Sequence, residues 1–143
     1  MTSWKTQAAA TLRNLEKDRQ AIDGLNAQIL EKKADMIALT ELGYGQPDAE
    51  EGVVPPKMKA LLDETRVLEA KLAAKTAHVR QVDRVLAAMH KDKRKVLKKC
   101  YCDGINVADA MIQLTWEMSA SESTLYRLKR QALKEFAKRM GWV

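Results

Sequence analysis

Apolar side chains recur along the first part of the chain with the period of an α-helix. From about Thr6 to Leu42 no proline interrupts the pattern. The seven-residue series is Leu15, Ile22, Ile29 and Met36, and the stripe is widened by Leu12, Leu25 and Leu39. This spacing predicts one long amphipathic helix. Gly24 falls inside it at a cost of roughly 1 kcal/mol relative to Ala, which weakens the expectation of an unbroken rod.

The helical pattern stops at residues 43–56, which hold three glycines and all three prolines of the chain. We expect a connecting loop there, because neither helix nor strand persists across such a segment. The pattern then resumes with Leu61, Leu68, Leu72, Val79, Val82, Leu86 and Met89. Two long helices joined by one loop most simply form an antiparallel hairpin.

Residues 1–89 are therefore expected to form a long, coiled-coil-like helical arm. A two-layer hairpin leaves an apolar edge uncovered, which is expected to be buried against another copy or against the C-terminal head. We therefore predict a homo-oligomer, either a dimer or another small oligomer. The alternative is a monomeric hairpin in which the two helices bury each other's apolar residues without a second copy.

Residues 90–143 have a different pattern, of shorter helices separated by turn signals. A short helix with Val96 and Leu97 on its apolar edge ends at Asp103-Gly104, where Gly suits a left-handed cap. A second helix is expected from about Asn106 to Trp116, with Val107, Ala110, Met111 and Leu114 buried. The chain is thus predicted to be all-α, with an N-terminal hairpin followed by a C-terminal head.

The hydroxyl-rich segment 118–124 predicts the start of a last helix. Ser119 and Glu122 have the spacing of a capping box, and Ser121 is an equally good N-cap. The helix is expected to reach about Met140 and to bury Leu125, Leu128, Ala132, Phe136 and Met140.

The charge of the chain is concentrated in this head. Residues 1–89 carry 13 Lys and Arg against 13 Asp and Glu, whereas residues 90–143 carry 12 against 6. A basic module of this size fits the phosphates of duplex DNA. The alternative is a solvated basic face without a partner.

A short helix, a turn, a second helix and a basic last helix are the parts of a helix-turn-helix, whose last helix lies in the major groove. Its first turns reach base edges and its later cations reach phosphate. The predicted base readers are Ser123, Thr124 and Arg127, with Ser121 at the helix start. The predicted phosphate contacts are Arg130, Lys134, Lys93, Arg94 and Lys98. The alternative is the basic end of a helical bundle.

Two segments resemble region four of bacterial sigma factors, in the variant found in phage late-gene regulators of the ArpU/RinA type. One runs from Val96 to Gly104, with an apolar pair, a tyrosine and an Asp-Gly turn. The more specific one runs from Ser121 to Leu133, with a Ser-x-Ser-Thr-apolar-Tyr-Arg pattern. The resemblance covers about 50 residues, and it implies a phage or prophage transcriptional regulator that switches on late genes. Between Gly104 and Ser121 the chain is about four residues longer than the family, and it lacks the familiar Glu-Ile-Ala signature.

Other function classes find little support in the sequence. His78 and His90 are isolated, and no Gly-rich phosphate loop or catalytic triad stands out, so we expect no enzyme and no cofactor. Cys100 and Cys102 with one histidine fall short of a zinc set, so no metal is expected. Two cysteines one residue apart are too few for a disulfide scaffold and indicate a reducing, cytoplasmic setting, which the resemblance implies to be that of a bacterial host cell. With no apolar run of about 18 residues and no signal core, we expect a protein that contacts no membrane.

The expected partner is double-stranded DNA, with RNA polymerase as a candidate second partner. Two other classes remain open. A phage small terminase subunit also joins a helix-turn-helix to a helical arm, although there we expect the head to precede the arm. A helical adaptor would grip a protein with the hairpin and leave the basic head solvated.

Overall fold

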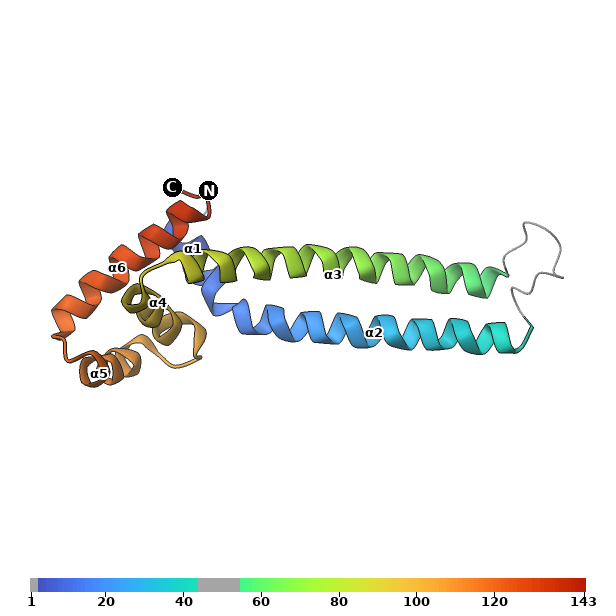
Figure 1. Cartoon of the computed structure of the whole chain (residues 1–143), viewed down its shortest axis with the longest axis horizontal. Coiled ribbons are helices and arrows are strands. Elements are labelled where there is room, and N and C mark those ends of the chain that lie inside the picture. The colour runs from blue at the N-terminus through green and yellow to red at the C-terminus, as the bar shows by residue number, and fades with distance from the viewer. Residues whose placement is uncertain (1–2, 44–54) are drawn as a thin grey trace. The chain divides into compact units, whose positions relative to one another are not determined.

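The computed structural model describes residues 3–43 and 55–143, and in this part of the chain it contains helices and no strand. The all-α prediction is confirmed. The elements are α1 (Trp4–Arg13), α2 (Leu15–Glu41), α3 (Pro56–Ala88), α4 (Lys91–Leu97), the π-helical turn η1 (Lys98–Cys102), α5 (Val107–Met118) and α6 (Glu122–Arg139) (Figure 1). None of the described helices is long and apolar enough to cross a membrane.

These helices form two compact units, which are described separately. The terminal unit contains the described residues up to Asp18 together with His78–Val143, and the central unit contains the described residues of Arg19–Ala77. This division differs from the sequence-based boundary at residues 89 and 90. The physical reason is that α1 contacts α6 and η1, so the first helix joins the C-terminal helices.

The expected single helix from Thr6 to Leu42 is wrong in one respect, because Asn14 separates α1 from α2. Asn14 has φ −87° and ψ −3° and stands at the end of α1, where its N–H donates to Ala10 O. Asn is a weak helix former, so an interruption here is inexpensive. Gly24, the expected weak point, lies inside a continuous α2. Residues 44–54 of the expected loop lie outside the described residues.

The central unit places α2 and α3 side by side, running in opposite directions (Figure 1). Lys32 Nζ lies 2.7 Å from Glu64 Oε2, and Lys33 Nζ lies 3.7 Å from Glu69 Oε1. The hydrogen bond to Glu64 raises the pKa of Lys32. Two helices alone cover their apolar residues incompletely. Ile29 and Leu39 are buried here, whereas six residues of the predicted apolar stripes are only half-buried, namely Ile22, Leu25, Met36, Leu61, Leu68 and Leu72.

The terminal unit has a core built around α6, which contacts α1, α4 and α5. The largest fully buried side chains of the described chain all lie in this unit: Phe136, Leu12, Leu97, Met111, Leu114, Leu125, Val82 and Val96. On α6, Leu128 is half-exposed, contrary to the prediction, while Leu133 and Ala137 are buried. Leu133 lies beside residues of α1, and the contact between α1 and α6 covers additional surface on α6.

Local signals begin and end the helices of this unit. Gly104 has φ +75°, as expected for the left-handed residue after η1. The Asn106 side chain accepts a hydrogen bond from Asp109 N at 2.8 Å and caps α5. Of the two candidate caps for α6, Ser121 is the one used, because its Oγ accepts from Thr124 N at 3.3 Å.

The turn between α5 and α6 consists of Ser119, Ala120 and Ser121, and Ser119 is left-handed with φ 50° and ψ 41°. A left-handed conformation costs an L-residue about 1–2 kcal/mol, and glycine avoids that cost. We therefore expect Ser119→Gly to raise the free energy of unfolding by roughly 0.5–1 kcal/mol, after glycine's own loss of chain entropy.

Urea denaturation of the full chain measures this change. The matched control is Ser123→Gly inside the first turn of α6, which should lower stability because glycine is a poor helix former. A loss of stability in Ser119→Gly would contradict the left-handed turn.

Candidate nucleic-acid interface

The first turn of α6 carries a cluster of hydroxyl groups. Ser121 Oγ lies 2.8 Å from Thr124 Oγ1 and 3.3 Å from Ser123 Oγ. All three side chains are exposed, and the free N–H groups of a helix start add donors at the same place. This end of α6 can therefore offer both donors and acceptors to a polar surface.

The exposed side of α6 continues this cluster as a stripe, hereafter the α6 stripe, formed by Ser123, Thr124, Arg127, Arg130 and Lys134. At 3.6 residues per turn these positions fall within about a third of the helix circumference. All five are exposed. Within the described residues, the three cations of the stripe form no ion pair. The stripe contains no acidic residue, so its positive charge is uncompensated.

The predicted phosphate contacts on α4 and η1 lie in a different setting. Lys93 Nζ is 3.4 Å from Glu135 Oε1 of α6, so this lysine is held in an ion pair inside the unit. Arg94 Nη1 donates to Ala87 O at 3.5 Å. Lys98 is exposed. Of the three, Lys93 is therefore the least able to reach a ligand.

Arg94 and Lys98 line a hollow of about 330 Å³, together with three lysines and two acids. Glu117 lies in this wall, with Lys95 Nζ 3.2 Å from its Oε2 and Lys99 Nζ 3.2 Å from its Oε1. Hydrogen bonds from these two lysines lower the pKa of Glu117. Part of the positive charge of this hollow is thus already neutralised.

Arg130 and Lys134 line a second hollow, which we call the α1–α6 groove, of about 660 Å³. Its wall includes Trp4, Lys5 and Arg13 of α1, Tyr101 of η1, and Lys129 of α6. Four of the five predicted phosphate contacts thus line two hollows, Arg94 and Lys98 in one and Arg130 and Lys134 in the other, while Lys93 is not among the lining residues of either. Sequence reasoning missed Lys5 and Arg13, because no local signal shows that α1 packs on α6, more than a hundred residues away.

Aromatic rings organise the cations of the α1–α6 groove. The Arg13 guanidinium carbon lies 5.4 Å from the centroid of the Tyr101 ring, and Lys129 Nζ lies 5.7 Å from it. Both distances are in the range of cation–π attraction. Burial raises the pKa of Tyr101, and the neighbouring Cys100 adds to the rise while Arg13 opposes it. The phenol is therefore neutral near pH 7.

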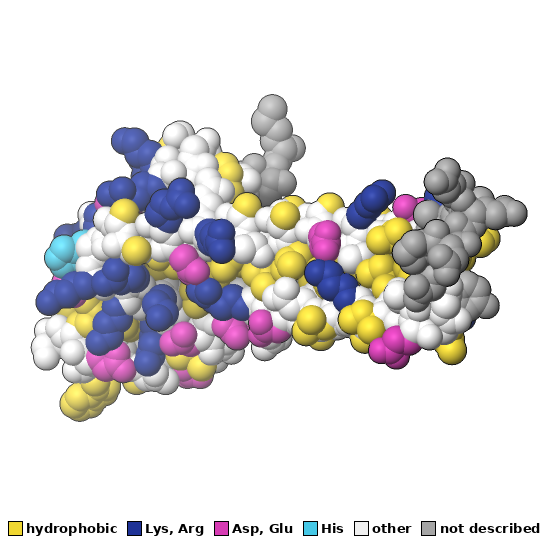
Figure 2. Space-filling model, turned by 45° about the vertical axis from the view of Figure 1, so that its right-hand side comes forward, with side chains coloured by type: hydrophobic (Ala, Val, Ile, Leu, Met, Phe, Trp, Pro, Cys, Tyr) yellow, Lys and Arg dark blue, Asp and Glu magenta, His cyan; other side chains and the backbone are white. Residues whose placement is uncertain are grey.

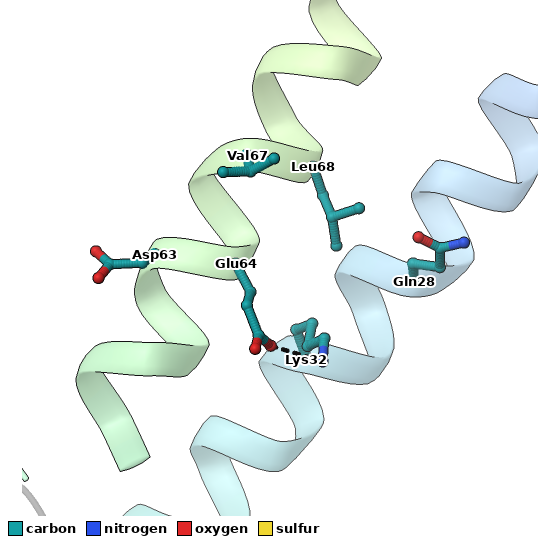
Figure 3. A pocket seen from close by; sticks show the side chains of 6 residues that line it. All are labelled: Gln28, Lys32, Asp63, Glu64, Val67 and Leu68. Carbon is teal, nitrogen blue, oxygen red and sulfur yellow. Dashed lines mark ion pairs between the residues drawn. The ribbon is translucent and has the colours of Figure 1, made fainter. Parts of the chain in front are cut away.

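Figure 2 shows Lys and Arg side chains gathered over the terminal unit on the face drawn, with fewer over the central unit. The central unit instead has a hollow of about 390 Å³, lined from α2 by Gln28 and Lys32 and from α3 by Val67 and Leu68 among others. In Figure 3, Glu64 and Lys32 point toward each other while Asp63 points away from α2. This hollow presents an ion pair beside apolar side chains and does not resemble the cationic surfaces of the terminal unit.

Metal-ligating and nucleophilic side chains of the described residues would form a further kind of site. In the described residues, no three His, Cys, Asp or Glu side chains are grouped to hold a metal ion. Cys100 is buried, and burial raises the pKa of its thiol, with Lys129 acting in the opposite direction. Cys100 is therefore a protonated packing residue at neutral pH.

Comparisons with models of protein families, with curated proteins and with solved structures found no match for this chain. The chemistry of the terminal unit is that of a cationic surface with hydroxyl donors at one helix start. Such a surface suits a phosphate-rich polymer whose base edges also accept and donate hydrogen bonds.

Proposed function

We propose that this chain is a sequence-specific DNA-binding transcriptional regulator, with α5, the three-residue turn and α6 acting as a helix-turn-helix. The observation that carries the proposal is the α6 stripe, which is exposed, free of acids and begins at a hydroxyl-rich cap. A helix of this kind fits the major groove of a duplex. The turn of Ser119, Ala120 and Ser121 has the length found in such motifs.

Within this proposal the residues divide by their place on α6. Ser123, Thr124 and Arg127 lie in the first turns and would contact base edges, since Arg pairs well with guanine. Arg130 and Lys134 lie farther along α6 and would contact phosphate. Arg94 and Lys98, which line the hollow beside α4 and η1, would also contact phosphate. The ion pair of Lys93 with Glu135 makes Lys93 the weakest of the proposed contacts.

The test is selection of binding sites from a random duplex pool with the full-length protein, followed by titration of the selected site. Arg127→Ala should lower the affinity by about 1–3 kcal/mol and relax the preference at one position. Lys134→Ala should weaken binding evenly across sequences and flatten its salt dependence.

The matched control is Arg84→Ala, which removes an exposed arginine of α3 in the same unit. It should bind as the unchanged protein does. If the unchanged protein enriched no sequence and retained no duplex at low salt, the proposal would fail and a helical adaptor would become the better interpretation.

The resemblance to phage late-gene regulators narrows the proposal to control of phage or prophage late genes, with RNA polymerase as a second partner.

Self-association is proposed for the central unit, which exposes Leu30 by 67%, Ile37 by 60% and Val67 by 55%. In Figure 2 hydrophobic side chains reach the surface along that unit. Sedimentation velocity can distinguish a transcriptional regulator from a small terminase subunit. A regulator should be a dimer or small oligomer, whereas a small terminase subunit should form a ring of many copies.

A further inference from the structure

We propose that α1 is part of the DNA-binding surface, and that the α1–α6 groove holds phosphates of the duplex strand beside the recognition helix. This role of α1 rests on the proposed function and adds to it a helix that lies more than a hundred residues away in sequence. Lys5 and Arg13 thereby acquire a role that the sequence pattern did not suggest.

The first support is the charge of the groove. Its lining contains five cations, namely Lys5, Arg13, Lys129, Arg130 and Lys134, and no acidic residue. The helix α1 itself has no Asp or Glu. By contrast, the hollow beside α4 is lined by Asp103 and Glu117 as well as by cations. Of these two hollows, the α1–α6 groove is thus the one in which positive charge is less compensated, and an anion there needs to displace no carboxylate.

The second support is the position of the groove relative to the α6 stripe. Arg130 and Lys134 belong to both, while Lys129 and Leu133 extend the groove to one side of the stripe. A helix that points its stripe at the bases has the sugar-phosphate backbone along its flanks. The strand on this flank would therefore run over the groove, between α6 and α1.

The third support is the way in which the wall is built. The Tyr101 ring lies within cation–π distance of Arg13 and Lys129, one from each side of the groove. A guanidinium stacked on a ring keeps its N–H edge available for phosphate. Ala9 and Ala10 also line the groove, so the wall of α1 between its cations is made of small side chains. A phosphate can approach closely there.

The test measures affinity for one duplex over a range of salt concentrations with the full-length protein. Each lost phosphate contact should reduce the slope of log K against log salt by about one. Arg13→Ala should show that change and a roughly threefold loss of affinity at moderate salt, equal for the selected and for random duplexes. The double variant Lys5→Ala/Arg13→Ala should lose about twice as much slope.

Three comparisons separate this role from a structural one. Arg13→Lys keeps the charge, so the slope in this variant should be close to that of the unchanged protein. If Arg13→Ala acted only through lost packing against Tyr101, it would leave the slope unchanged and lower the melting temperature. Arg84→Ala removes the same charge outside the groove and should leave the slope unchanged. Arg127→Ala should change sequence preference, which the variants of α1 should not.

The outcomes of the two proposals are distinguishable. If the unchanged protein bound a defined site and the α1 variants kept its full salt dependence, the role of α1 would be overturned while the proposed function stood. If the unchanged protein bound no duplex, both would be overturned.

Discussion

Phe136→Ala should lower the free energy of unfolding of the terminal unit by about 3–5 kcal/mol, because it empties a large and fully enclosed site. Phe136 is fully buried and is the single phenylalanine of the chain. Its ring lies edge-on to Trp142, with 6.1 Å between centroids and 74° between planes. Truncation removes this contact and leaves a cavity on α6, the helix that α1, α4 and α5 all contact.

Urea denaturation followed by circular dichroism measures the loss. Because whole domains are stable by only about 5–15 kcal/mol, the variant should unfold at a much lower urea concentration. Phe136→Leu keeps most of the volume and should cost far less. Trp116→Ala is the matched aromatic control on α5, since Trp116 is 81% exposed and should change stability by less than about 0.5 kcal/mol. Equal effects of Phe136→Ala and Trp116→Ala would contradict the described core.

Features set by a few neighbouring residues could be predicted from the sequence. The cap at Ser121 and the left-handed Gly104 each depend on contacts within about one helical turn, and both are found where the sequence allowed them. The heptad series also predicted helix from about Thr6 to Leu42, and α2 occupies Leu15–Glu41 of that range, because the period is a property of the segment itself. Local chemistry therefore accounts for these features.

Features set by distant contacts could not be predicted in the same way. The helix is interrupted at Asn14, and the segment before it, α1, packs on α6. The sequence around Asn14 contains no signal that predicts this packing. The buried Leu133 lies beside α1 at the α1–α6 groove, so the covered side of α6 depends on what lies against it, and the half exposure of Leu128 has no structural explanation. The π-helical hydrogen bonding of Lys98–Cys102 likewise has no evident sequence signal.

The candidate site shows the same division. The α6 stripe follows from helical spacing within one segment, so its five residues could be predicted from the sequence. Lys93 was predicted with them on charge alone, yet it is paired with Glu135 across two helices. Counts of charged residues can identify a basic unit. Which cations form ion pairs, and which cations line which hollow, depends on how the helices pack.

Leu12→Ala should lower the free energy of unfolding of the same unit by about 2–5 kcal/mol, although Leu12 is far in sequence from the C-terminal helices. Leu12 is fully buried on α1, which contacts α6 and η1, so removing its side chain leaves a cavity in a core that is mainly C-terminal. Hydrogen exchange of α6 amides should become faster in this variant, because α1 covers one side of that helix. Leu42→Ala, just after α2, is the matched control, since Leu42 is 75% exposed and should change stability by less than about 0.5 kcal/mol.

The two leucines separate the possible roles of the N-terminal segment. If α1 were only the beginning of a helical arm, Leu12→Ala would cost little and would leave exchange in α6 unchanged. If α1 completes the C-terminal core, Leu12→Ala loosens α6 and with it the wall of the α1–α6 groove. On the proposed function, affinity for duplex DNA should then fall in Leu12→Ala at temperatures near its lowered melting point and return on cooling. Leu42→Ala should bind as the unchanged protein does. A loss that persisted on cooling would mean that the substitution acts on the surface itself and not through the stability of α1.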